Sequence, residues 1–332
     1  MLNVVLLAVA VLKGPFPLLV TPWTEKAELD VSVLVKEAEY VDACGVGGII
    51  WPTAGEVAAL EASGEYGKGI EAIAWRSVDR NAPFTARVTA ICPGTTSAEA
   101  VRRVATVEAI ARRTGAKMAI LARPPDDATN QLMMAQHYRA VARTTTLPVI
   151  IQTYNGNSPQ PDVGLLVDLA REFPDTFGWV KEESPGDKVN DRMAQLVSHP
   201  EIHGVFSGWG GKGFVYQGAR IGTCGVITQR PAYAKLLTRV WTRLAAGKDA
   251  SDPELAQAYS RYLYMTNLGD IFSRYGDDEM RGPHLYVLQR LGIFRTRLTR
   301  TGSPGSFKVE DYVMSAEMKA EVDARLKFAG IE

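Results

Sequence analysis

The stretch FGWVKEES, residues 177–184, is a short apolar run that leads directly into a lysine, Lys181. A lysine at the carboxyl end of a buried strand lies at the rim of a dry interior. Because burial disfavours the ammonium form of an amine, some neutral amine becomes available to attack a ketone and form a Schiff base. The alternative is a lysine that extends to water or pairs with Glu182 or Glu183. These residues alone leave both interpretations open.

Seven other apolar runs alternate with helical patterns along the chain, which predicts parallel strands joined by crossover helices. The predicted strands are Pro17–Thr21, Gly48–Trp51, Phe84–Ile91, Lys117–Leu121, Pro148–Gln152, Phe177–Lys181, His203–Ser207 and Thr223–Ile227. Eight strands is the number of a (β/α)8 TIM barrel, a fold of about 250 residues. In this chain of 332 residues, the barrel with its catalytic site is expected over residues 1–247.

The rest of the chain, residues 248–332, is expected to be a helical C-terminal extension of the same domain. Helical segments are predicted roughly at Pro253–Tyr275, Met280–Leu291 and Val309–Phe328, without strands between them. They are interpreted as helices that pack on the barrel and supply subunit contacts.

Charge and cysteine content favour a small-molecule partner. Lys+Arg and Asp+Glu number 37 each, so there is no basic field for nucleic acid. Three cysteines, far apart in sequence, are interpreted as buried, reduced thiols. His199 and His203 are four residues apart, but Pro200 interrupts any helix that would place both on one face. We therefore expect neither a metal site nor a cofactor.

The apolar run Leu2–Leu12 has no preceding positive charge and is too short to span a bilayer. It is interpreted as a buried N-terminal segment, with a weak signal peptide as the alternative. The composition elsewhere shows no membrane segment, so a cytoplasmic protein is expected.

Barrel enzymes carry their chemistry at the carboxyl ends of strands. After the second predicted strand, the loop Pro52–Glu56 consists mainly of small residues. The Thr53 hydroxyl and the backbone around Ala54 are candidates for binding a carboxylate, with an ordinary turn as the alternative.

Three other strand ends carry candidate residues. The fifth strand ends at Gln152, and Ser207 and Gly208 lie at the end of the seventh, where glycine would allow backbone to approach a polyhydroxy substrate. Arg123, after the fourth strand, is a further candidate for binding an anionic group. A purely structural role remains open for each of them.

Four motifs, in this order, resemble the dihydrodipicolinate synthase / N-acetylneuraminate lyase family over about residues 13–295. They are Gly14–Trp23, the Pro52–Glu56 loop, Leu147–Ile151 and Trp179–Glu182. The resemblance implies a barrel with C-terminal helices that assembles into a homo-oligomer, usually a tetramer, with a dimer as the alternative. It further implies that Lys181 condenses with the ketone of pyruvate or another 2-keto acid, whose carboxylate the Pro52–Glu56 loop binds.

Two tyrosines of the synthases are missing. Gln152 stands where family members usually carry a tyrosine that relays protons, and an amide cannot act as an acid or base. Ala122-Arg123 stands where the synthases have a second tyrosine, contributed by a neighbouring subunit. Tyr154 would face the same side of an extended chain as Gln152 and is the candidate replacement.

The 2-keto-3-deoxy sugar-acid dehydratases are more similar, since they share the glutamine and a run like Lys181–Gly186. In that run Glu183 lies on the side of the strand that carries Lys181, as a candidate base or ion-pair partner. The expected function is a Schiff-base lyase, an aldolase or dehydratase, that acts on a 2-keto-3-deoxy sugar acid or a similar 2-keto acid. A dihydrodipicolinate synthase and a non-catalytic keto-acid-binding protein are the alternatives.

Overall fold

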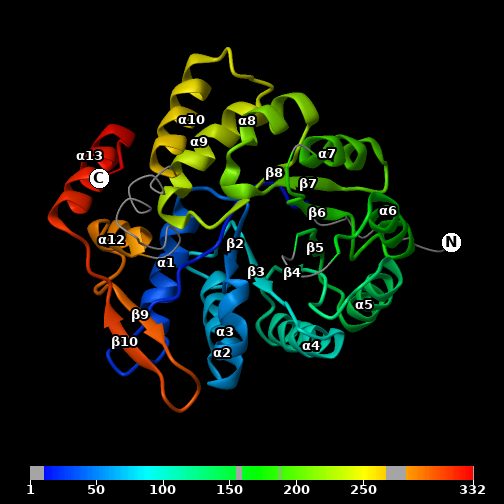
Figure 1. Cartoon of the computed structure of the whole chain (residues 1–332), viewed down its shortest axis with the longest axis horizontal. Coiled ribbons are helices and arrows are strands. Elements are labelled where there is room, and N and C mark those ends of the chain that lie inside the picture. The colour runs from blue at the N-terminus through cyan, green and yellow to red at the C-terminus, as the bar shows by residue number, and fades with distance from the viewer. Residues whose placement is uncertain (1–10, 155–158, 187, 267–281, 332) are drawn as a thin grey trace.

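The computed structural model describes residues 11–154, 159–186, 188–266 and 282–331. Eight parallel strands occupy the middle of the molecule and helices surround them (Figure 1). The strands are β1 (Gly14–Pro17), β2 (Gly48–Trp51), β3 (Arg87–Ile91), β4 (Met118–Ala122), β5 (Val149–Gln152), β6 (Trp179–Glu182), β7 (Gly204–Ser207) and β8 (Gly225–Thr228). Their order in the sheet is β1-β8-β7-β6-β5-β4-β3-β2, and a bridge between Leu18 and Ile50 brings its two edges together. The predicted (β/α)8 barrel is confirmed.

Strand β1 lies closer to the N-terminus than the predicted Pro17–Thr21. The backbone N–H groups of Gly14 and Leu18 donate to β8 and its flank, at Cys224 and Thr228. Pro15 and Pro17 occupy alternate positions, which have no N–H to offer a second neighbour. The prolines are therefore compatible with pairing to β8 while the contact with β2 is reduced to a bridge.

The helices around the barrel are α1 (Val31–Ala43), α2 (Val57–Ala62), α3 (Glu65–Ser77), α4 (Ser97–Thr114), α5 (Gln131–Thr144), α6 (Val163–Glu172), α7 (Lys188–Ser198), α8 (Phe214–Tyr216) and α9 (Ala234–Ala245). Where the structure describes the residue before the helix, four of them begin after a residue whose side-chain oxygen accepts a backbone hydrogen bond from the first turn. These N-cap residues are Asp30, Thr96, Asn130 and Asp162.

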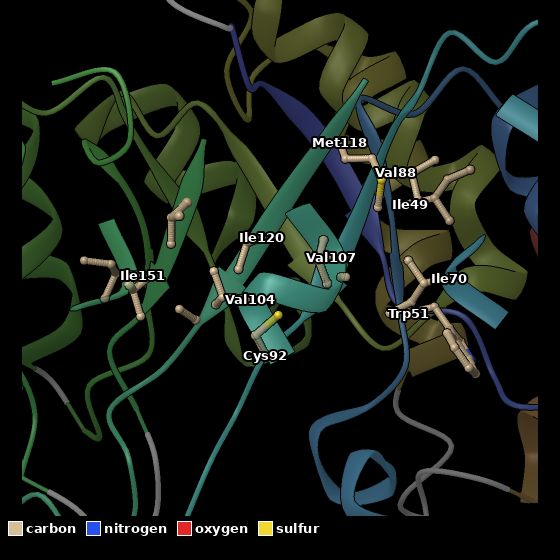
Figure 2. Packing of buried hydrophobic residues seen from close by; sticks show 14 of the residues in the cluster. Ile49, Trp51, Ile70, Val88, Cys92, Val104, Val107, Met118, Ile120 and Ile151 are labelled. Carbon is tan, nitrogen blue, oxygen red and sulfur yellow. The ribbon is translucent and has the colours of Figure 1, made fainter. Parts of the chain in front are cut away.

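Side chains on the two faces of the strands form separate apolar layers. The outer layer packs strand residues such as Ile49, Val88 and Ile120 against helix residues such as Ile70 and Val104 (Figure 2). The inner layer fills the barrel, with Phe16, Ile50, Ile150, Trp179 and Phe206 among its members. Because strand side chains alternate between faces, the residue two positions after Trp179 also faces inward, at the end of the packed interior. That residue is Lys181.

The C-terminal part contains α10 (Pro253–Thr266), α12 (Gly282–Arg290) and α13 (Ala316–Ala329). Residues of α9, α10 and α13 share one buried apolar cluster, so these helices pack on the barrel as expected. Part of the predicted segment Pro253–Tyr275, the start of Met280–Leu291 and residues 1–10 lie outside the described residues.

The prediction that this part lacks strands is wrong. Strands β9 (Leu298–Thr301) and β10 (Lys308–Asp311) form an antiparallel hairpin, seen at the lower left of Figure 1. The chain between 309 and 315 is consequently not helical. Arg300 ties the hairpin to the barrel: its Nη1 lies 2.5 Å from Glu65 Oε2, and its guanidinium stacks 3.6 Å from the centre of the Trp23 ring. Both strands consist mainly of polar residues, with β9 partly buried and β10 largely exposed, which explains why no apolar run indicated them.

Candidate active site

Lys181 lies on β6 at the carboxyl end of the barrel, with its side chain 8% exposed. Its Nζ is 3.0 Å from Glu183 Oε2, so the lysine and the second acidic residue after it face the same side of the strand. Glu182, between them, points to the outer side, where its buried carboxylate pairs with Arg192 of α7. The strand therefore presents one amine and one carboxylate to the mouth of the barrel.

Glu183 is held by donors on both carboxylate oxygens. Lys181 and the Gln152 amide, Nε2 at 2.8 Å, both reach Oε2, and the backbone N–H of Trp209 donates to Oε1 at 3.2 Å. The backbone N–H of Glu183 itself donates to Thr153 Oγ1 at 2.9 Å. These contacts hold the carboxylate in direct contact with the amine.

Gly208 leaves the space that Glu183 occupies. A Cβ at this position would lie 2.2 Å from Glu183 Cγ and 2.7 Å from its Oε1, closer than real Cβ contacts. Gly208 was predicted to let backbone approach a substrate. In the structure, the side chain of Glu183 occupies the space beside this glycine. The next residue, Trp209, has φ at 49°, a conformation uncommon for a residue with a side chain. Its indole N–H donates to Ser184 O at 3.2 Å.

Gly208→Ala is expected to displace Glu183 from Lys181 and to lower catalysis by about 100-fold, the scale of loss that a misplacement of 1 Å can cause. The exchange of pyruvate methyl protons with D2O, followed by NMR, measures this step. Gly67→Ala on α3 is the matched control, since its added Cβ would meet Thr106 Cγ2 at 3.7 Å, an ordinary contact. Equal exchange rates in the two variants would show that the position of Glu183 does not limit proton transfer.

Tyr154 lies next to this group, with its ring centre 5.4 Å from that of Trp209. The structure thus brings Lys181, Glu183, Gln152 and Gly208 into direct contact and places Tyr154 against Trp209 at their edge.

Ser207 is not brought to Lys181. Its hydroxyl is buried and donates to Gln217 Oε1 at 2.5 Å, and Gln217 in turn donates to Asn190 on α7. In the sheet Ser207 is the register partner of Glu182, and both side chains point outward. Its predicted contact with substrate finds no support in this orientation.

Thr53 and Ala54 line a cavity of about 410 Å³ at the barrel mouth, together with Gly55 and Glu56. Cavities of about 300–1,000 Å³ are typical of small-molecule sites. The Thr53 hydroxyl donates to Glu56 Oε2 at 2.7 Å, and the Thr21 hydroxyl donates to the same oxygen at 2.9 Å. Lys181 and Glu183 are not part of the wall of this cavity, which extends from the loop toward the β9 strand.

A buried carboxyl group lies behind the same wall. Glu37 of α1 accepts a hydrogen bond from the Val20 backbone N–H at 3.0 Å. Burial raises the pKa of Glu37 well above its usual value, the Val20 hydrogen bond opposes this in part, and the charge of Glu56 adds to it. The neutral form is therefore more favoured in Glu37 than in an exposed glutamate.

Sequence reasoning missed the residues that support the pair. Thr153 accepts from Glu183 and donates to Glu182, and Arg192 neutralises Glu182 from α7. A signal was available, because a glutamate in a buried strand requires a charged partner. No feature of the sequence indicated that the backbone N–H of Trp209 would donate to Glu183.

Other expectations concern cysteines, metals and membranes. Cys44, Cys92 and Cys224 are free, but only Cys92 is fully buried, whereas the other two are partly exposed. Across residues 11–331, leaving out the gaps, no three His, Cys, Asp or Glu side chains are grouped as a metal would require. Within the same part of the chain, no helix combines the length and the apolarity needed to cross a bilayer.

Comparisons with known proteins agree with this architecture. The 4-hydroxy-tetrahydrodipicolinate synthase of Methanococcoides burtonii is 25% identical over 246 residues, 74% of this chain and 78% of that protein. The dihydrodipicolinate synthase of Cyanidioschyzon merolae, crystallised with lysine, superposes with a TM-score of 0.75 at 18% identity, covering 97% of this chain and 99% of the other. A prophage protein of E. coli K12, crystallised with pyruvate, gives 0.74 at 16% identity, covering 97% and 100%. At these identities the two structures establish the fold.

The sequence match establishes the family. Residues 11–261, most of the chain and all eight barrel strands, match the dihydrodipicolinate synthetase family. The chain therefore belongs to the dihydrodipicolinate synthetase family, whose members are class I aldolase-type lyases.

Proposed function

We propose that the protein is a Schiff-base lyase in which Lys181 forms an imine with a 2-keto acid, and that its substrate is a 2-keto-3-deoxy sugar acid. One observation carries this proposal: the buried Nζ of Lys181 lies 3.0 Å from Glu183 Oε2 at the mouth of the family's barrel. An amine must lose a proton before it attacks a carbonyl, and Glu183 is within hydrogen-bonding distance to accept it.

The chemistry uses these two groups in sequence. The neutral amine of Lys181 adds to the C2 carbonyl, and loss of one water gives a protonated imine. The positive imine withdraws electrons from C3, so that Glu183 can remove a C3 proton and leave an enamine. The enamine expels the C4 hydroxyl, which takes up the proton and departs as water. One water then hydrolyses the imine, which releases the dehydrated product and restores Lys181.

Aldol cleavage needs the same imine. A base removes the proton of the C4 hydroxyl, the C3–C4 bond breaks, and its electron pair enters the imine to form an enamine. An aldehyde leaves, and the enamine takes up a proton at C3 before hydrolysis. Lys181 serves both reactions, so the residues that surround C4 decide between them.

The position of Gln152 supports proton transfer by Glu183. The Gln152 amide donates to Glu183 Oε2 at 2.8 Å, so this residue orients the carboxylate next to the lysine. The cavity supports a substrate larger than pyruvate, since its volume is about 410 Å³ and Thr21, Gln229 and Thr299 contribute polar groups to its wall. Hydroxyl groups of a sugar acid find hydrogen-bond partners in such a wall.

The direct test is reductive trapping. The protein is incubated with pyruvate and with a series of 2-keto-3-deoxy acids, borohydride is added, and the intact mass is measured. An imine reduced in this way increases the mass by that of the keto acid less one oxygen atom. Peptide mapping should locate the adduct on Lys181, and NMR of unreduced mixtures identifies the product. The absence of an adduct with every keto acid, or an adduct on another lysine, would contradict the proposal.

Synthase activity is the second candidate, because the Methanococcoides burtonii relative carries that name. We expect condensation of pyruvate with aspartate semialdehyde to be negligible, since Gln152 and Ala122 stand where the synthases have tyrosines. A coupled assay with both substrates measures it beside turnover of the 2-keto-3-deoxy acids. Rapid condensation would reverse the order of the two candidates. An adduct that forms without turnover of any acid would instead indicate a keto-acid-binding protein.

A further inference from the structure

The cavity at the barrel mouth contains an arginine, Arg123, whose guanidinium has no direct hydrogen-bond or ion-pair partner among the described residues. Arg123 follows β4 and lines the same cavity as Thr53 and Ala54. Its Nε is buried, and no atom of the described part of the chain forms a hydrogen bond with it. Among the residues that the structure describes, no hydrogen bond or ion pair to its guanidinium is formed. A partly buried charge of this kind is costly to keep, so a ligand that would satisfy it is expected to be an anion.

The other charged groups in the cavity wall are already paired. Arg300 is bound to Glu65 and stacked on Trp23, 3.6 Å from the ring centre. Glu56 accepts hydrogen bonds from the hydroxyls of Thr21 and Thr53. Arg123 is thus the charged wall residue whose donors the described residues leave available. Its guanidinium stays protonated in any protein environment and offers planar, paired donors that match a carboxylate.

The neighbouring Pro52–Glu56 loop has no cation and no available side-chain hydroxyl to bind a carboxylate. Ala54 contributes no hydroxyl, and the hydroxyl of Thr53 is directed to the Glu56 carboxylate at 2.7 Å. A carboxylate bound to the backbone N–H groups of this loop would therefore find the Thr53 hydroxyl occupied and the Glu56 carboxylate nearby. A guanidinium in the same cavity supplies both the charge and the donors that the loop lacks.

We propose that Arg123 binds the C1 carboxylate of the 2-keto acid and thereby holds its carbonyl at Lys181. This inference deepens the proposed function and rests on it for the identity of the ligand. In the sheet Ala122 pairs with Ile151 and Gln152 pairs with Lys181, so Arg123 follows β4 at the level of Gln152 and Lys181. Burial lowers the pKa of Arg123, and the nearby Asp126 and Glu183 offset part of this effect.

Binding of a more distant anionic group is the competing assignment. In that case Arg123 would select dicarboxylic keto acids and would not affect pyruvate, which has only the C1 carboxylate. The location of Arg123 in one cavity with Thr53 and Ala54 favours the C1 group.

The test compares Arg123→Met, Arg123→Lys and Arg87→Met. Arg87 is the matched control, because it is also a half-buried arginine, at the start of β3 and so at the opposite end of the barrel. The first readout is the pyruvate concentration that gives half-maximal borohydride-trapped adduct. The second is the melting temperature with lactate, which has the C1 carboxylate but no ketone and so binds without forming an imine. Lys181→Arg is included in the lactate series.

Arg123→Met is expected to raise the half-saturating pyruvate concentration by about 10–100-fold, the range for hydrogen bonds to a charged group, with the maximal adduct unchanged. Arg123→Lys should lie between it and the wild type, and Arg87→Met should match the wild type. Lactate should stabilise the wild type and Lys181→Arg but not Arg123→Met.

Three results overturn the assignment. The first is equal binding of pyruvate and of lactate by Arg123→Met and the wild type. The second is a loss of affinity in Arg123→Met that is confined to 2-oxoglutarate, a dicarboxylic keto acid. The third is a wild type that binds neither lactate nor pyruvate. A wild type that forms no adduct but shows Arg123-dependent stabilisation by lactate would instead contradict the imine chemistry and leave the carboxylate site in place.

Discussion

Lys181→Arg is expected to abolish the borohydride-trapped adduct and to lower turnover by about 10⁴-fold or more, as when a covalent nucleophile is removed. The substitution keeps a cation next to Glu183, which lies 3.0 Å from the lysine amine in the wild type. A guanidinium remains protonated and cannot attack a ketone. The variant therefore removes the nucleophile and retains the ion pair, so that loss of activity is not explained by an unpaired buried carboxylate. Intact mass after reduction and proton exchange of pyruvate measure the two effects.

Lys117→Arg is the matched control for this prediction. Lys117 directly precedes β4 and is exposed at the opposite end of the barrel from Lys181. The Lys117→Arg variant should form the adduct on Lys181 at the wild-type rate. If Lys181→Arg still gave a stoichiometric adduct, the imine would form on another lysine and the role of the Lys181–Glu183 pair would be structural.

The orientation of Lys181 and Glu183 was accessible from sequence because it depends on a local rule. Side chains two residues apart on a strand share a face, and Trp179, Lys181 and Glu183 follow that rule through the end of β6. The family motif Trp179–Glu182 could be recognised for a similar reason, since it lies within one strand.

The face of β7 was not accessible in this way. Residues 204–207 are apolar or small and buried on both sides, so their pattern contains no alternation that would identify the inward face. Only the register with β6 shows that Phe206 faces the interior and Ser207 faces α7 and Gln217. The candidate role of Ser207 was assigned without that information.

The part of the cavity wall that comes from β9 could not be predicted from the sequence either. Leu298, Thr299 and Arg300 lie in the wall next to residues that precede them by more than two hundred positions. The hairpin that contains them is polar, and it is held in place by the contacts of Arg300 with Glu65 and Trp23. Such long-range contacts depend on tertiary packing, which periodicity does not report.

Glu183→Gln is expected to retain imine formation at equilibrium and to lose most of the catalysis of C3 proton transfer. Lys181 is unchanged, so the extent of adduct with pyruvate should match the wild type after long incubation. A neutral amide cannot accept the C3 proton, and general acid–base catalysis contributes about 10²–10⁴-fold. The exchange of pyruvate methyl protons with D2O should therefore fall by that factor, while borohydride still traps the adduct.

The amide should also fit the site without a large rearrangement. In the wild type, Glu183 Oε2 accepts from Lys181 and Gln152, and Oε1 accepts from the Trp209 backbone N–H. Either orientation of a glutamine amide places its NH2 group against one of these donors, so a modest loss of stability is expected beside the kinetic effect. A melting curve separates this loss from the catalytic one.

Tyr154→Phe provides the control, because it keeps the ring that lies 5.4 Å from Trp209 and removes only the hydroxyl. If Glu183 carries the proton, this variant should exchange pyruvate protons at nearly the wild-type rate. The opposite pair of results, with rapid exchange in Glu183→Gln and a collapse in Tyr154→Phe, would assign the proton to the tyrosine. Glu183 would then serve as the ion-pair partner of Lys181, held by Gln152 to keep the amine in position for the ketone.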